Sequence, residues 1–228
     1  MYVELLKYTD DPERVVALAA RLCYTKSSIG ELKNNLSDEY VNRLVQKIIS
    51  LGHLSVLEHA SFSFGIEGIS RATSHQLVRH RIASYSQQSQ RYVEYDNLEI
   101  VLPPSIAADS EACGKFNEGI GIIEDLYRWM ISRGVPVEDA RYILPNAAVT
   151  RVIVTMNARE LNHFFQLRCC RRAQWEIRNM AKEMLKKVKK VAPVIFNKSG
   201  PGCLRGPCTE GEFTCGKPDE VREEFQKP

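Results

Sequence analysis

The chain has 228 residues, of which 44% are hydrophobic and 26% are charged, a globular composition that argues against intrinsic disorder. The formal net charge is only +3, and no run of about 18 apolar residues is present to span a bilayer. Seven scattered cysteines, and an N-terminal segment without a basic leader or an apolar stretch, predict a cytoplasmic protein with reduced thiols and no membrane partner.

Positive charge is concentrated in two stretches of the sequence. Residues 68–93 contain four arginines and no acidic residue, and residues 141–190 contain twelve basic residues against three acidic ones. The rest of the chain is therefore net acidic. This segregation predicts a partner that carries negative charge.

The first part of the chain alternates between strand and helix patterns. Asp11 followed by Pro12 is a typical helix start, and Gly52 is typical of a helix end. The elements expected in chain order are a strand at 1–8, a helix from 12 to about 22, a polar loop at 25–36, a helix capped by Ser37, a half-buried strand at 60–66, a helix from Ser70 to about 78, and a loop at 79–92.

The second part predicts two long helical regions around one strand. A helix is expected at 106–133, with a buried face made by Cys113, Phe116, Ile120, Ile123, Tyr127 and Met130. After it come a connector at 141–145, a β-branched strand at 149–156, and a helix from 158 to about 190 that breaks near 168–172. We predict one main domain at 1–195 and a tail at 196–228 with high Gly, Pro and Cys content.

The loop at 79–92 carries the most specific pattern. Arg79, His80 and Arg81 are followed after seven residues by Ser89, and then by Arg91. No carboxylate lies between Glu67 and Glu94, so these guanidiniums can offer forked donors to the oxygens of a phosphate or a pyrophosphate. The alternative from the residues alone is a set of surface or subunit-interface ion pairs.

This RHR motif with a serine eight positions after its last arginine resembles the signature of the flavin-dependent thymidylate synthases. Two other blocks are similar to that family: GHLSVLEHASFSF at 52–64, and RYILPNAAVTRVIVTMNARELNHFFQLR at 141–168. The resemblance covers most of residues 1–195. It implies an α/β (α+β) fold with a central, mostly antiparallel sheet flanked by helices, and a homotetramer with active sites shared between subunits.

The resemblance also implies an activity: conversion of dUMP to dTMP with methylenetetrahydrofolate as carbon donor, FAD as redox carrier and NADPH as reductant. The chain lacks a GxGxxG unit, so NADPH is expected from the family alone. The residues implied for FAD are Ser55, Arg79, His80, Arg81, Gln87, Asn157, Ala158, Arg159 and His163. Those implied for dUMP are Gln76, Leu77, Val78, Arg79, Gln87, Gln88, Ser89, Gln90, Arg91, Arg141 and Arg168.

Two of these positions are implied to be catalytic. Arg168 matches the position that activates the pyrimidine, where a guanidinium stabilises negative charge as the ring N3 proton is lost. Ser89 matches the position of a catalytic nucleophile, but a serine needs an adjacent base for that role, so we expect it to orient dUMP. Many members carry a histidine where this chain has Arg172.

The histidines and cysteines invite a metal interpretation that the spacing does not favour. His53, His59, His75 and His80 form no HxxxH or HExxH pair, so no metal site is expected there. In the tail, Cys203, Cys208 and Cys215 lack a CxxC pair, and loosely ordered reduced thiols are favoured over zinc. Cys169 and Cys170 lie beside arginines, which predicts lowered thiol pKa values and oxidation sensitivity.

A function of another class remains open from the residues. A non-catalytic RNA- or DNA-binding protein would also use the arginines of the loops, on the phosphate backbone. Aromatic residues are not interleaved with the basic loop in a base-stacking pattern, apart from Tyr85 and Tyr92. The enzyme hypothesis, with small nucleotides and no nucleic-acid polymer as partners, is therefore favoured.

Overall fold

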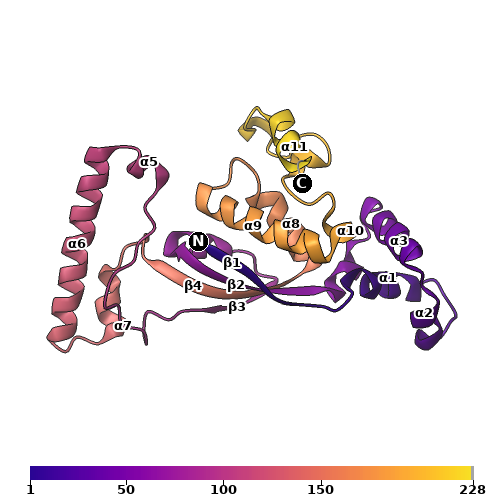
Figure 1. The fold of residues 1–228 in the computed structure, drawn as a ribbon, viewed down its shortest axis with the longest axis horizontal. Helices are drawn as coiled ribbons and strands as arrows, with labels where there is room; N and C mark the ends of the chain where they lie inside the picture. The colour runs from indigo at the N-terminus through magenta and orange to yellow at the C-terminus, as the bar shows by residue number, and fades with distance from the viewer. Residues whose placement is uncertain (227–228) are drawn as a thin grey trace. The chain divides into compact units, whose positions relative to one another are not determined.

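A computed structural model describes residues 1–226 of the chain, and Figure 1 shows its fold. The strands form one four-stranded antiparallel sheet in the order β1-β2-β4-β3, which confirms the predicted fold class. Their bounds are β1 Tyr2–Tyr8, β2 Ser61–Ser70, β3 Ala83–Gln87 and β4 Val149–Asn157. In this order β4 lies between β2 and β3, although β2 and β3 follow one another in the sequence.

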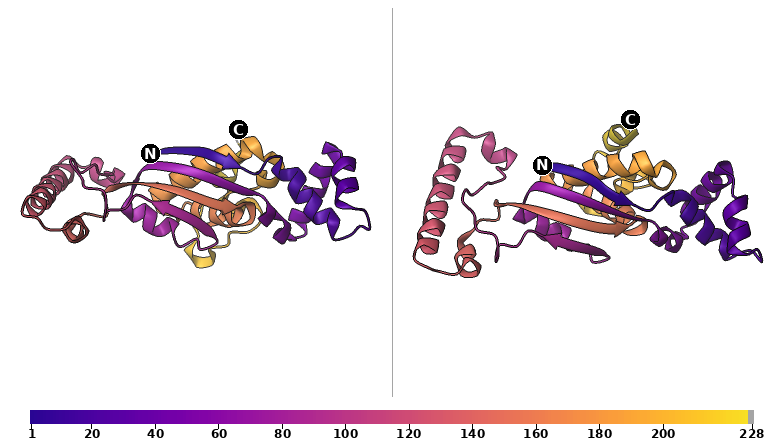
Figure 2. Two further views of the ribbon diagram at one scale, coloured as in Figure 1. Left: turned by 90° about the horizontal axis from the view of Figure 1, so that it is seen from below. Right: turned by 60° about the horizontal axis from the view of Figure 1, so that its bottom comes forward.

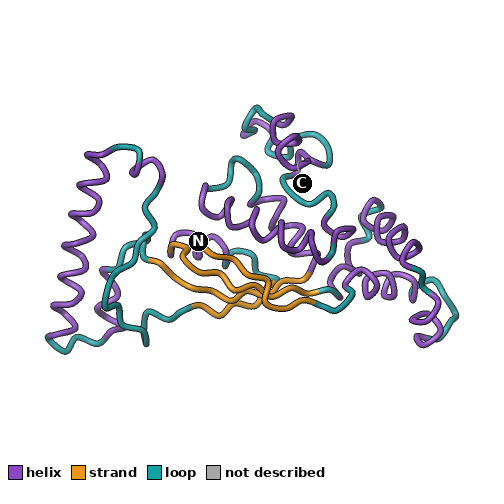
Figure 3. The backbone as a smooth tube through the Cα atoms, in the orientation of Figure 1, coloured by secondary structure: helices purple, strands orange, loops and turns teal. Residues whose placement is uncertain are grey.

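Helices account for most of the remaining described residues (Figure 3). The α-helices are α1 Pro12–Leu22, α2 Ile29–Asn35, α3 Asp38–Ser50, α4 Arg71–Leu77, α5 Pro104–Ala107, α6 Ser110–Ser132, α7 Val137–Ala140, α8 Ala158–Arg168, α9 Trp175–Val191, α10 Pro193–Phe196 and α11 Pro218–Gln226. Short 3-10 turns are η1 Leu54–His59, η2 Arg141–Ile143, η3 Gly202–Leu204 and η4 Gly211–Phe213.

Several predicted element boundaries are confirmed by cap geometry. The side chain of Ser37 accepts from the backbone N–H of Tyr40 at the start of α3, and Ser70 caps α4 in the same way. Gly52 ends the α3 region with φ 76°, a left-handed conformation that glycine adopts without the cost of a Cβ. The expected break between two helices also occurs, since α8 ends at Arg168 and α9 starts at Trp175.

Three predictions about elements were wrong. The loop expected at 25–36 contains α2, whose start is stabilised by a capping box between Ser28 and Glu31. The loop expected at 79–92 contains β3, a mostly polar strand at the edge of the sheet. In the helix expected at 106–133, α5 is separate from α6, and of the predicted buried face only Tyr127 is fully buried.

The described residues divide into two compact units. Within residues 1–226, one unit comprises 1–2, 66–79 and 85–153, and the other comprises 3–65, 80–84 and 154–226. The first contains α4 to α7, among which α5 and α6 pack together; Figure 2 shows this pair from two sides. The division into 1–195 and 196–228 stays a prediction, and its last two residues lie outside the described part of the chain.

The second unit holds the larger apolar core. Phe62 of β2 packs edge-on against Phe196 of α10 at 5.3 Å between ring centroids, and Phe165 of α8 meets the same ring at 6.0 Å. All three rings are fully buried. On α9, the buried residues recur at the three- and four-residue spacing of one helix face: Ile177, Met180, Ala181, Met184 and Val188. This core fixes α8, the helix that carries Arg168.

Within residues 1–226, the structure contains no helix that is both long and apolar enough to cross a membrane.

Candidate active site

In the second unit, one residue of the RHR motif meets two residues of α8. His80 is buried, its Nδ1 lies 3.1 Å from Oε1 of Glu160, and its Nε2 lies 3.1 Å from Nε of Arg168. Glu160 is buried as well, and Arg168 is half-buried. A carboxylate, an imidazole and a guanidinium thus form a continuous hydrogen-bonded row.

The donors and acceptors in this row determine the tautomer of His80. The Nε of Arg168 can only donate, so Nε2 of His80 accepts and must be unprotonated. The ring proton therefore resides on Nδ1, which donates to the carboxylate of Glu160. Burial, followed by the charges of Arg168 and His163, lowers the pKa of His80 to about 4. The imidazole is neutral near pH 7, and the pair with Glu160 is a hydrogen bond to a neutral ring.

The local sequence explains why these groups meet. Glu160, Phe164 and Arg168 recur every four residues on α8, so they share one face of the helix. The ring of Phe164 stands edge-on to the imidazole of His80 at 4.9 Å between centroids. Burial raises the pKa of Glu160 and lowers that of Arg168, because both charged groups have lost part of their water.

Glu160 is a functional candidate that the sequence interpretation missed. Its signal was present, because it is one of only three acids in the basic stretch at 141–190 and lies two turns before Arg168 on a predicted helix. An isolated glutamate in the first turn of a helix is more simply explained by the helix dipole, which favours acids at that end. The contact with His80 across 80 residues of sequence is visible only in the structure.

The start of α8 and the turn η1 hold other predicted flavin residues. Asn157 caps α8 by accepting from the backbone N–H of Glu160, and the Ala158 N–H donates to the carbonyl of Ala60. Arg159 pairs with Glu58 of η1 at 2.6 Å between Nη1 and Oε1, where both side chains are about half exposed. Ser55 is exposed on η1. Asn157 and Ala158 therefore have structural roles that do not depend on a ligand.

The arginines on either side of His80 are both exposed, and the structure gives neither an ion pair within residues 1–226. Arg79 belongs to the first unit and Arg81 to the second. His163 of α8 is exposed and faces His80, with 6.0 Å between the ring centroids. Exposed guanidiniums without a protein carboxylate are the donor type that a pyrophosphate requires, so these residues fit a dinucleotide cofactor.

In the first unit, Arg91 and Arg141, two of the residues implied for dUMP, contact the same residue. Arg91 binds the Glu138 carboxylate through Nε at 2.9 Å and Nη2 at 2.8 Å, and Arg141 donates from Nε to the Glu138 carbonyl at 3.0 Å. Glu138 lies on α7. Arg91 and Arg141 are thus held beside one another, and the carboxylate occupies the forked donors of Arg91.

The polar residues Gln87, Gln88 and Ser89 lie at the C-terminal end of β3 and directly after it. Gln87 donates to Thr150 of β4 at 3.1 Å, the Gln88 N–H donates to the Arg151 carbonyl at 2.9 Å, and Ser89 Oγ accepts from the Arg91 N–H at 3.1 Å. The described bonds of Ser89 include no histidine or carboxylate. The remaining predicted substrate residues differ in exposure: Leu77 is buried, Gln76 and Gln90 are half-buried, and Val78 is exposed.

The thiol prediction for Cys169 and Cys170 was wrong. Burial raises the pKa of Cys169 to about 12, and burial is also the largest of the causes that raise the pKa of Cys170. Loss of water outweighs the neighbouring arginines, because Arg171 directs its guanidinium to Glu220 at 2.7 Å and Arg172 is exposed. Cys169 is therefore an unreactive core residue near neutral pH.

Comparisons with known proteins agree on one family. A family model described as "Thymidylate synthase complementing protein" matches residues 4–194. The chain is 60% identical over 229 residues to the flavin-dependent thymidylate synthase of Geobacter sulfurreducens, covering 100% of this chain and 99% of that protein. It is 50% identical over 236 residues to that of Clostridium tetani (96% and 95% covered) and 47% identical over 220 residues to that of Pyrococcus furiosus (92% and 90% covered).

Proposed function

Because the chain belongs to the family of flavin-dependent thymidylate synthases, we propose that it converts dUMP to dTMP with methylenetetrahydrofolate, FAD and NADPH. The observation that carries the proposal is the row Glu160–His80–Arg168, which holds one guanidinium of α8 on the histidine of the RHR motif. Bound FAD supplies the redox chemistry of the reaction. The residues of the chain bind the nucleotides and stabilise charge.

Arg168 has the central catalytic role in this proposal. Its guanidinium stabilises negative charge on the uracil as the N3 proton is lost, which makes C5 more nucleophilic toward the one-carbon unit. The bond from Nε to His80 fixes the plane of the guanidinium. Such preorganisation is what electrostatic catalysis needs, since no donor has to reorient while the charge develops. No covalent bond between protein and substrate is required.

His80 and Glu160 act as positioning residues for Arg168. A neutral imidazole accepts from the guanidinium without adding a second positive charge beside it, and the buried carboxylate keeps the ring proton on Nδ1. If the ring were protonated, both of its nitrogens would be donors and the bond from Arg168 would be lost. The low pKa of His80 therefore preserves the arrangement.

Arg91 and Arg141 are assigned to the phosphate of dUMP. Their common neighbour Glu138 supports this role, because its carboxylate occupies the fork of Arg91 at the place where a phosphate dianion can replace it. Arg91 and Glu138 are each about half exposed, so this exchange needs no unfolding. The end of β3, with Gln87, Gln88, Ser89 and Gln90, provides polar groups for the nucleoside, and Ser89 orients the substrate.

Arg79, Arg81, Arg159 and His163 are assigned to FAD, together with Ser55 and the start of α8. The exposure of Arg79 and Arg81 supports this assignment. A homotetramer is also proposed. Ile122, Leu126 and Trp129 support it, since they are spaced for one face of α6 and are 64%, 44% and 58% exposed. Sedimentation of the purified protein tests this part, and a monomer at micromolar concentration contradicts it.

One assay tests the proposed reaction. The full chain is purified, its visible spectrum is recorded, and dTMP formation is followed with dUMP, methylenetetrahydrofolate and NADPH. We expect the absorption of an oxidised flavin and dTMP production that requires all three substrates. A colourless protein that makes no dTMP after reconstitution with FAD rejects the proposal, and salt-sensitive binding of DNA or RNA by that protein would identify a nucleic-acid binder.

A further inference from the structure

Four of the seven cysteines line one small cavity in the second unit. Cys170 follows α8, Cys203 lies in η3, and Cys208 and Cys215 lie on either side of η4. The cavity has a volume of ≈ 10 Å³, which is about the space that one water molecule or one ion needs. The fold thus brings together cysteines separated by up to 45 residues of sequence, around a cavity that can hold one water molecule or one ion.

The pKa values of these thiols support their proximity. The pKa of Cys203 is raised first by burial and next by the charge of Cys170, with smaller effects of Cys208 and Cys215. The charges of Cys215 and Cys208 likewise raise the pKa of Cys170, after burial and Glu210. Cys203 is therefore close enough to be affected by the other three thiols, and Cys170 by Cys208 and Cys215. The four sulfurs form one electrostatic cluster.

The segment that supplies three of these cysteines has little apolar core. Among residues 201–225, only Pro201, Cys203 and Val221 are buried, and the regular structure before α11 consists of two three-residue turns. A chain this poor in buried apolar area needs a cross-link, a metal or another staple to keep one conformation. Glycines allow close packing there, since a Cβ on Gly202 would lie 2.7 Å from Oγ1 of Thr209.

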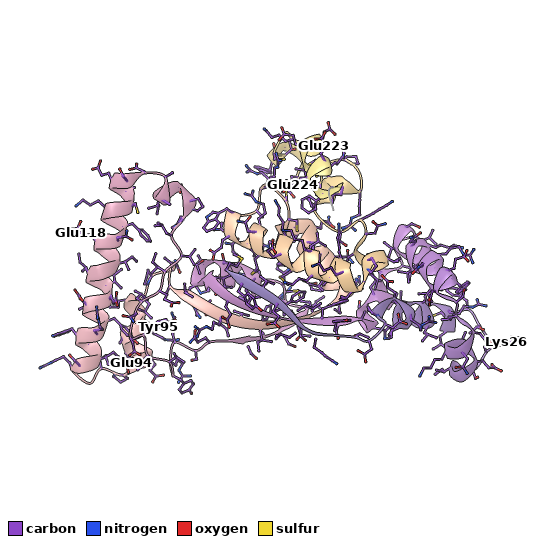
Figure 4. The ribbon with its side chains drawn as sticks, in the orientation of Figure 1. Lys26, Glu94, Tyr95, Glu118, Glu223 and Glu224 are labelled. Carbon is purple, nitrogen blue, oxygen red and sulfur yellow. The ribbon has the colours of Figure 1, made fainter. Side chains whose placement is uncertain are left out.

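Ion pairs join this segment to α9 and to the turn between α8 and α9. Arg171 binds Glu220 at 2.7 Å, and Lys182 of α9 binds Glu224 of α11, the residue labelled in Figure 4. Arg222 donates to the carbonyls of Cys203 and Gly206 at 3.0 and 3.1 Å. These contacts are mostly at the surface, and surface ion pairs contribute only about 0–1 kcal/mol each. They orient the segment around the cysteine cavity without replacing a staple at its centre.

We infer that Cys170, Cys203, Cys208 and Cys215 form a structural zinc site, with one Zn²⁺ bound by four thiolates. Four sulfur ligands are typical of closed structural zinc sites, and the cavity has room for one ion. Within residues 1–226, no group of three His, Cys, Asp or Glu side chains is already arranged to hold a metal ion. In this proposal the four thiols therefore turn toward the cavity as the ion binds. Binding releases the four thiol protons to water and involves no redox change.

The site has a structural consequence for α8. Cys170 lies two residues after Arg168, so a metal bound to Cys170 holds the C-terminal end of α8 against the cysteine-containing segment. The sequence alone offered only three tail cysteines, and the structure supplies the fourth ligand from the end of α8. A disulfide between two of the four thiols is the competing arrangement, but it requires an oxidant.

The test is the metal content of the full chain, expressed in zinc-supplemented medium and purified without chelators. We expect about one zinc per chain by mass spectrometry, and at least a tenfold loss in Cys208→Ser and Cys215→Ser. Cys23→Ser and Cys113→Ser are matched controls, since both cysteines lie outside the cavity and should retain the metal. A natural chain free of zinc, or variants of the four cysteines that keep it, overturns the inference.

A second measurement on the natural chain avoids the question of whether the variants fold. Alkylation of the native protein should spare these four cysteines, and a strong chelator should expose them, as peptide mapping would show. A disulfide among them, or iron with acid-labile sulfide in place of zinc, contradicts a single-ion site. The flavin spectrum and dTMP formation are recorded in parallel, so that failure of the zinc site is distinguished from failure of the proposed reaction.

Discussion

The Nε of Arg168 donates to Nε2 of His80 over 3.1 Å, and this bond links α8 to the RHR motif. Its direction requires a neutral imidazole, which burial and the charges of Arg168 and His163 favour, while the buried Glu160 accepts the ring proton's hydrogen bond from Nδ1. Within the RHR motif, His80 is therefore buried and bonded to the side chains of Glu160 and Arg168.

Replacing His80 tests whether it positions Arg168. His80→Ala removes the acceptor, so we expect kcat to fall about 10- to 100-fold, the equivalent of one charge-assisted hydrogen bond of about 1.5–3 kcal/mol. His80→Gln keeps an acceptor for Arg168 and a donor for Glu160, and it should restore most of the rate. Steady-state kinetics with saturating FAD checks both variants. An equal loss of kcat in the two variants would show that His80 does not act through its hydrogen bonds to Arg168 and Glu160.

The phosphate arginines should have a different kinetic signature. Arg91→Ala and Arg141→Ala each remove a phosphate contact, so the KM for dUMP should rise about 10- to 100-fold with kcat changed much less. Arg128→Ala is the matched control, because this exposed arginine of α6 pairs with acids of its own helix. Initial rates over a range of dUMP concentrations give both constants. A fall in kcat without a change in KM would contradict the assignment.

The low pKa of His80 predicts how stability depends on pH. In the unfolded chain a histidine titrates near 6.5, whereas burial, Arg168 and His163 lower the pKa of His80 to about 4. Between these values the unfolded chain binds a proton that the folded chain does not, so the free energy of unfolding falls as pH falls from 6.5 to 4. The raised pKa of Glu160 has the opposite sign and offsets part of this loss.

His80→Gln should therefore show a shallower loss of stability between pH 7 and pH 5 than the natural chain. Urea unfolding at the two pH values measures the difference. His75→Gln, which changes an exposed histidine of α4, should behave like the natural protein. If His80→Gln loses as much stability on acidification as the natural chain, His80 does not carry the effect.

The packing of the second unit predicts that removing the ring of Phe196 strongly lowers the free energy of unfolding. Phe196 is fully buried and contacts both Phe62 and Phe165, so Phe196→Ala should lower the free energy of unfolding by about 3–5 kcal/mol. Phe213 is 63% exposed, so Phe213→Ala should change the free energy of unfolding by less than about 0.5 kcal/mol. Chemical denaturation compares the two. Similar effects would mean that the ring of Phe196 is not part of the core.

The elements that the sequence predicted correctly have local causes. Ser37, Ser70 and Gly52 define helix ends through their own side chains or backbone, and the apolar spacing of α9 matches its buried face. By contrast, β3 is stabilised by bonds to β4, such as that from Gln87 to Thr150, and its polar residues carry no hydrophobic alternation. The capping box of Ser28 and Glu31 was a local signal for α2 that the polar composition of the segment obscured.

The candidate site likewise contains some residues that the sequence predicts and others that only the structure reveals. The residues of the RHR loop and Arg168 were recognisable from a motif, whereas Glu160 and Glu138 were not, because each acts through a partner distant in sequence. The prediction that arginines would activate Cys169 was wrong because adjacency in sequence does not determine solvation. Of the two tyrosines considered for base stacking, Tyr85 donates to the carbonyl of Leu77 at 2.9 Å and Tyr92 is 80% exposed.

The most direct test of the central claim is single-turnover dTMP formation by Arg168→Ala compared with the natural enzyme, both loaded with FAD and saturated with dUMP. We expect the variant to retain its flavin spectrum and its dUMP binding to within about tenfold, while the rate of dTMP formation falls by at least about 100-fold. An unchanged rate, or a loss explained entirely by weaker flavin or dUMP binding, would contradict the assignment of Arg168 as the group that stabilises charge on the uracil.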